Sequence, residues 1–69
     1  MAKNYYVNKN AQPTGEHEVH AEDCSWLPDV SNRQYLGCFD SCRDAVKKAK
    51  EYYNKVDGCY YCSSLCHTR

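Results

Sequence analysis

The clearest pattern of apolar positions lies between residues 41 and 58. Apolar side chains recur there at the i, i+3, i+4, i+7 spacing that marks one face of an α-helix. Ser41 and Asp44 have the spacing of a capping box at a helix start, and Gly58 is suited to a left-handed cap at a helix end. We therefore predict one helix of about four turns. Its apolar face would contain Cys42, Ala45, Val46, Ala49, Tyr52 or Tyr53, and Val56.

Shorter segments before this helix have the composition of strands. Residues 5–9 hold two tyrosines and a valine, and residues 16–21 resume an extended pattern after a group of turn-forming residues that ends in Gly15. These two segments predict a hairpin. A short third strand is predicted at residues 34–39, with Gly37 as a bulge. The expected fold class is α+β, with a small antiparallel sheet packed by one main helix.

The length of the chain limits how well such a fold can be stabilised. The 69 residues make a single domain, residues 1–69, and a chain of this size buries only roughly 60% of its unfolded surface. Domains with so thin a core usually need a disulfide or a metal ion. The chain has six cysteines and three histidines that could supply one.

Charge and targeting signals narrow the function classes. Lys plus Arg and Asp plus Glu both number nine, so no net charge attracts nucleic acid or an anionic membrane. No apolar run is long enough to span a bilayer, and the first residues lack the apolar stretch of a signal peptide. We expect a cytoplasmic monomer without membrane contact. In that compartment cysteines more often bind metal than form a disulfide framework.

Two short-spaced pairs of potential ligands flank the predicted helix. His20-x3-Cys24 lies at the end of the second strand, and Cys59-x2-Cys62 follows Gly58. Zn²⁺ takes four such ligands in a tetrahedron, and a short spacing within each pair keeps the entropic cost of closure small. We predict a Zn²⁺ site at these four residues, in which the Cys-x2-Cys zinc knuckle closes the fold against the first hairpin.

The other cysteines and histidines are alternative ligands. Cys66 lies one helical turn after Cys62 and could replace His20, and His67 follows directly. His17 and His20 are too close together for the H-E-x-x-H protease motif and point to opposite faces of a strand, so we expect His17 on the sheet surface. Cys42 is expected to be a buried thiol on the helix face. A Cys42–Cys66 disulfide is the alternative that the spacing leaves open.

Three segments together resemble a known family: VH-x3-C at residues 19–24, LGCFDSCRDAVKKAK at residues 36–50, and GCYYC at residues 58–62. The pattern resembles the small zinc-binding domain of the bacterial Ada DNA-repair protein, and more closely the short Ada-like modules that stand alone. The resemblance covers residues 19–62 and implies a small α+β domain around one zinc. In the Ada domain the first ligand is a cysteine that accepts methyl groups from DNA. Its counterpart here is His20, which cannot serve as that thiolate.

The expected function follows from this combination. We expect a small zinc-binding protein with a structural metal site, without enzymatic activity, which acts as an accessory or interaction module for a protein partner. The alternative is a weak nucleic-acid-binding module related to DNA repair, which would use basic side chains of the helix. Alternating acidic residues on that helix disfavour tight binding to nucleic acid. The alternative would involve Arg43, Lys47, Lys48, Lys50 and Lys55.

Overall fold

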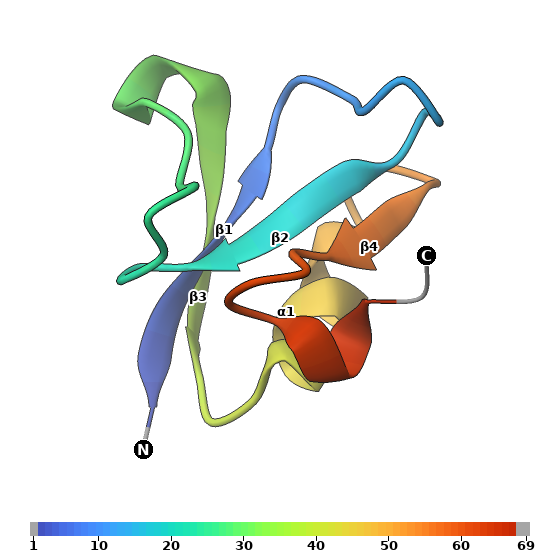
Figure 1. Ribbon diagram of the computed structural model, residues 1–69. Helices are drawn as coiled ribbons and strands as arrows, with labels where there is room; N and C mark the ends of the chain where they lie inside the picture. The colour runs from blue at the N-terminus through green and yellow to red at the C-terminus, as the bar shows by residue number, and fades with distance from the viewer. Residues whose placement is uncertain (1, 68–69) are drawn as a thin grey trace.

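The computed structural model describes residues 2–67 and has the predicted α+β class (Figure 1). Four strands form one sheet in the order β3-β1-β2-β4. One α-helix within these residues, α1 (Cys42–Ala49), packs on the sheet, and the two short 3₁₀ helices are η1 (Val30–Asn32) and η2 (Ser64–Cys66). The strands are β1 (Lys3–Asn8), β2 (His17–Ala21), β3 (Arg33–Phe39) and β4 (Val56–Gly58).

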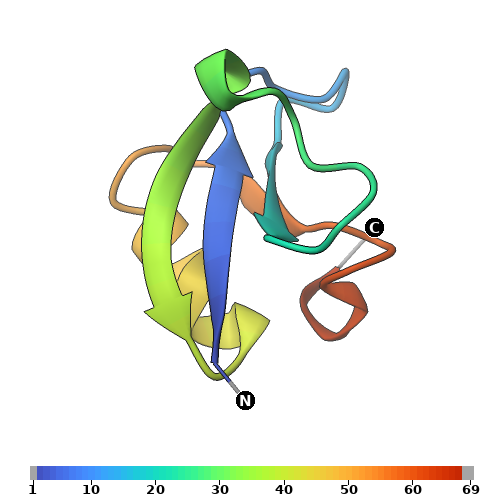
Figure 2. The same cartoon turned by 90° about the vertical axis from the view of Figure 1, so that its left-hand side faces the viewer.

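The first three strands match the sequence prediction. β1 lies in the centre and pairs antiparallel with both β2 and β3, as Figure 2 shows. The β1–β3 register shifts between Tyr5 and Tyr6, opposite Gly37, whose φ of 134° is in the region that favours glycine. The predicted bulge at Gly37 is therefore confirmed. Gly15, with φ of 92°, turns the chain between β1 and β2.

The fourth strand was not expected, and a purely antiparallel sheet is the wrong description. β4 pairs parallel with β2, with Val56 opposite His17 and Gly58 opposite Val19. A parallel neighbour requires a long crossover, and here residues 22–55, including α1, supply it. Three residues of strand beside a predicted helix end carry almost no periodic signal of their own.

The helix is shorter than predicted, because it ends at Ala49 instead of continuing towards Gly58. Ser41 is at the N-cap position, but its side chain makes no capping hydrogen bond, so the capping box is not formed. After Ala49 the hydrogen bonds tighten into a last turn that ends at Tyr53. Gly58 is not a helix cap, since it belongs to β4. Residues 52–54 are weak helix formers, and pairing with β2 draws the following residues into the sheet.

The core lies between α1 and one face of the sheet. Val7, Val19, Ala45 and Ala49 have no exposed surface. Side chains alternate along strands, so Val7 and Val19 face the helix, while their neighbours on the same strands point to the other face. The remaining core residues are Tyr5, Ala21 and Leu36, with Phe39, Cys42, Val46, Tyr53, Val56 and Cys62 packed against them.

A disulfide between Cys42 and Cys66 joins the start of α1 to η2. Cys42 packs against the core as expected, but the prediction of a free thiol there is wrong, and the disulfide left open by the spacing is formed. This crosslink lies beside Gly58. A Cβ atom at that glycine would come within 2.7 Å of the Cys66 Cβ and of the Ser63 carbonyl oxygen, which explains why a glycine is needed there. No helix in residues 2–67 is long and apolar enough to cross a bilayer.

Candidate metal centre

Four potential metal ligands meet where the end of β2 lies against the chain that follows β4. They are the four residues that the sequence singles out: His20, Cys24, Cys59 and Cys62. Their donor atoms all lie within 4.8 Å of one another. The two ligand pairs are therefore brought together from opposite ends of the chain. We call these residues the four-residue cluster.

The distances within the cluster suit a tetrahedral ion. The Cys24 sulfur lies 3.7 Å from Nδ1 of His20 and 3.9 Å from the Cys59 sulfur, and the Cys62 sulfur lies 3.9 Å from the same Nδ1. Zinc bonds of usual length imply about 3.8 Å between two sulfurs and about 3.6 Å between sulfur and nitrogen. The Cys24–Cys59 separation is far too long for a disulfide. The donor atoms are thus spaced for a shared ion.

The end of β2 positions the first pair. The backbone N–H of Cys24 donates to the Ala21 carbonyl, and the N–H of Leu27 donates to the Cys24 carbonyl, so the chain turns back over β2. The Trp26 backbone N–H donates to the Cys24 sulfur at 3.4 Å. Such N–H···S bonds stabilise a thiolate, the form that binds metal.

The second pair lies in residues 59–62, the segment that we call the knuckle. That this segment closes the fold through a metal stays a prediction, because the covalent link that the structure shows here is the Cys42–Cys66 disulfide. The Cys59 N–H extends the β4 pairing by donating to the Val19 carbonyl, and the Ser63 N–H closes the turn onto the Cys59 carbonyl. Burial raises the pKa of the Cys59 thiol, and the backbone N–H groups of Tyr61 and Cys62 oppose that shift.

The Cys62 thiol is in a similar environment. Burial raises its pKa, and the Ala21 N–H, which donates to the sulfur at 3.3 Å, lowers it. Burial therefore disfavours the charged thiolate at both knuckle cysteines until a cation lies beside them.

His20 is buried as deeply as Cys59, and each has 2% of its surface exposed. Burial lowers its pKa to about 4, so the imidazole is neutral at physiological pH and has a lone pair for a metal. Its Nδ1 faces the sulfurs, while Nε2 has no hydrogen-bond partner among the described residues. Oε1 of Glu18 lies 3.7 Å from Nε2, which is too long for a hydrogen bond and, with a neutral ring, is not an ion pair.

The alternative ligands named from the sequence lie outside the cluster. His17 stacks on Tyr53 at 3.7 Å between ring centres, and its Nδ1 lies 2.8 Å from the Asn8 carbonyl oxygen. His67 places Nδ1 at 2.9 Å from the Gly58 carbonyl oxygen. Cys42 and Cys66 are joined to each other. His17 and His20 therefore do not face the same group of side chains.

Sequence reasoning missed the surroundings of the cluster. Glu18 and the exposed rings of Trp26, Tyr60 and Tyr61 lie beside it and line one hollow together with His20 and Cys59. Their positions in the sequence contained a signal, because Trp26 follows Cys24 closely and the two tyrosines stand between the knuckle cysteines.

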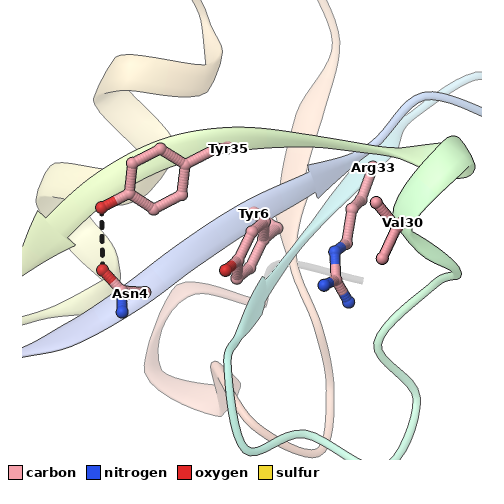
Figure 3. A pocket seen from close by; sticks show the side chains of 5 residues that line it. All are labelled: Asn4, Tyr6, Val30, Arg33 and Tyr35. Carbon is pink, nitrogen blue, oxygen red and sulfur yellow. Dashed lines mark hydrogen bonds between the residues drawn. The ribbon is translucent and has the colours of Figure 1, made fainter.

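A second hollow, of about 480 Å³, lies over β1 and β3 (Figure 3). The Tyr35 hydroxyl donates to Oδ1 of Asn4 there, and the Arg33 guanidinium lies 4.5 Å from the centre of the Tyr6 ring. None of the residues that line it is a histidine, cysteine or carboxylate, so it offers no set of metal ligands. The lining residues are Asn4, Tyr6, Val30, Arg33 and Tyr35.

No protein-family model, no curated protein and no solved structure matches this chain. The resemblance to the Ada-like modules therefore stays a prediction from the quoted segments. The geometry of the four-residue cluster is the observation that bears on function.

Proposed function

We propose that the protein binds one zinc ion through His20, Cys24, Cys59 and Cys62, and that this ion has a structural role. The convergence of these four donors at tetrahedral spacing is the observation that carries the proposal. Each pair comes from a different segment, so the ion would join the end of β2 to the knuckle.

The donor set favours zinc over the hard cations. Three thiols and an imidazole are ligands for Zn²⁺, whereas Ca²⁺ and Mg²⁺ take oxygen ligands. The partial burial of the cluster also fits a structural ion, since its members are buried or half-buried. An ion bound through Nδ1 would also fix the His20 tautomer, because the proton of the neutral ring would then lie on Nε2.

With four protein ligands the site is closed, and a closed zinc site holds no water or substrate in its coordination shell. We accordingly propose an accessory or interaction module with no chemistry of its own. No contact of the helix favours the nucleic-acid alternative. Of its basic side chains, Lys48 forms an ion pair with Glu51 at 3.1 Å, and Asp44 lies in the first turn.

Metal analysis of purified variants tests the proposal. The unaltered protein is expected to hold one zinc per chain, and Cys59→Ser should hold less than a tenth of that under the same chelator competition, since a ligand is lost. Cys38→Ser is the matched control, because Cys38 is an exposed free cysteine outside the cluster. Zinc content that is equal in all three proteins, or absent from all three, contradicts the proposal.

A further inference from the structure

A hollow of about 360 Å³ opens directly beside the four-residue cluster. Two cluster members, His20 and Cys59, form part of its wall, so the hollow and the metal centre share side chains. We call it the aromatic cavity. The residues that line it are Asn8, Gln12, Glu18, His20, Trp26, Cys59, Tyr60 and Tyr61.

Three aromatic rings on one side of the cavity are largely exposed. Trp26, Tyr60 and Tyr61 have 61%, 62% and 66% of their surfaces accessible. Trp26 stacks on Tyr61 with ring centres 5.4 Å apart, and Tyr60 stands at 90° to Tyr61. The rings thus form a corner of two perpendicular walls. In a protein with so small a core, three large exposed rings at one place mark a binding surface.

The rings are also attached to anchored backbone. Trp26 follows Cys24 closely, and Tyr60 and Tyr61 lie within the knuckle, whose ends are both proposed ligands. When the metal holds Cys24, Cys59 and Cys62, the backbone that carries all three rings is held in place. A preorganised aromatic surface loses little entropy when it binds a ligand. This step rests on the proposed metal site.

The charge around the cavity has one sign. Glu18 is the only lining residue with a charged side chain at neutral pH, and no lysine or arginine lines the cavity. An adjoining hollow shares Gln12 and Glu18 and is also lined by Glu16, Asp57 and His67, without a lysine or arginine; there Nδ1 of His67 lies 3.2 Å from the Asp57 carboxylate. Three thiolates around Zn²⁺ leave a net negative charge beneath the rings. The potential therefore favours a cation and repels phosphates.

From these observations we propose that the aromatic cavity binds a methylated ammonium group, either as a small free cation or as a side chain of a peptide. Ring faces attract a weakly hydrated cation through their quadrupoles, and tyrosine and tryptophan provide the strongest such contacts. The carboxylate of Glu18 adds a direct charge interaction. A nucleobase would also stack on the rings, but its phosphates would meet the carboxylates.

The test is a titration of protein of measured zinc content with choline, followed by NMR of the Trp26 and tyrosine ring signals. The matched ligand is 3,3-dimethyl-1-butanol, which has the shape of choline without its charge. We expect the neutral compound to bind at least about tenfold more weakly. Equal binding of the two compounds, or no change of the ring signals with choline, overturns the proposal.

Variants locate the binding. Trp26→Leu and Tyr61→Leu should each weaken choline binding by about tenfold. Tyr52→Leu is the control, since Tyr52 is another exposed tyrosine but does not line the cavity, and it should bind as the unaltered protein does. Equal affinities in all of these proteins place the cation elsewhere and overturn the assignment.

A short peptide containing trimethyl-lysine, compared with the same peptide containing lysine, separates the two sources. Tighter binding of the trimethylated peptide than of choline identifies a peptide side chain, and the reverse order identifies a free cation. Metal content is measured separately. If the protein holds zinc but does not bind choline, the proposed cation site is wrong and the proposed metal site is not. If the protein is folded and binds choline but holds no zinc, the proposed metal site is wrong and the proposed cation site is not.

Discussion

The terminal segment, residues 56–67, contacts two regions of the protein, the helix α1 and the end of β2, through different interactions. On the helix side, the Cys42–Cys66 disulfide adds to a packed core in which Ala45 and Ala49 are fully buried against the sheet. On the other side, the four-residue cluster brings together polar and sulfur ligands, and His20 is buried there without a partner for Nε2. The helix side has apolar packing that does not depend on its crosslink. On the cluster side, burial of the cysteines as charged thiolates is unfavourable until an ion binds them.

Removal of the metal should therefore produce the largest effect. We expect Cys59→Ser, or excess chelator under anaerobic conditions that leave the Cys42–Cys66 disulfide intact, to abolish most tertiary structure, because zinc binding in small domains is worth on the order of 10 kcal/mol of folding free energy. The measurement is the dispersion of the amide NMR spectrum. A well-dispersed spectrum in chelator contradicts the dependence of the fold on the cluster.

Loss of the disulfide should lower the stability of the protein less than loss of the metal does. The bond closes a sequence separation of 24 residues, for which chain entropy predicts a stabilisation of about 3 kcal/mol. The double variant Cys42→Ala/Cys66→Ala should keep one zinc per chain and unfold at lower denaturant concentration. If this variant loses its zinc, the two sides of the terminal segment are not independent.

Gly58→Ala tests the point where the two sides meet. An added Cβ would clash with Cys66 and with the backbone of Ser63, so the chain must shift. We expect a destabilisation of about 1–3 kcal/mol, as for other overpacked sites, measured by denaturant unfolding of the zinc-loaded protein. Unfolding at the same denaturant concentration as the unaltered protein would mean that this close approach is not present in solution.

Glu18→Gln should affect the cluster side alone. If Nδ1 of His20 binds the metal, Nε2 carries the proton, and the carboxylate at 3.7 Å, although too far for a hydrogen bond, can orient that N–H through its charge. We expect zinc affinity to fall about tenfold, the lower end for such outer partners of a ligand. Glu51→Gln is the control, because Glu51 pairs with Lys48 on the helix side. Equal zinc affinity in the two variants would assign Glu18 no orienting role.

A change of pH near neutrality should have the smallest effect. The pKa of His20 is lowered to about 4 by burial, below the value of about 6.5 in an unfolded chain. Between these values the unfolded chain binds more protons than the native protein, so stability falls as the pH decreases through this range. The His20 ring signals of the zinc-loaded protein should not change from pH 7.5 to 5.5. A titration midpoint near 6.5 would contradict its burial as a neutral ligand.

Local patterns were sufficient to find the first three strands, the start of the helix and the four clustered residues. His20-x3-Cys24 and Cys59-x2-Cys62 could be recognised because each pair is short and its spacing reflects ligand geometry. Gly37 could be recognised because a positive φ restricts the residue type.

Long-range contacts decided the rest. The sequence by itself determined an α+β domain with one set of ligands, because period and spacing are local properties of a chain. Whether residues 56–58 continue a helix or form β4 depends on pairing with β2, which no local pattern records. The bond between Cys42 and Cys66, and the gathering of Trp26, Tyr60 and Tyr61 around one cavity, likewise exist only because the folded chain brings distant residues within contact distance.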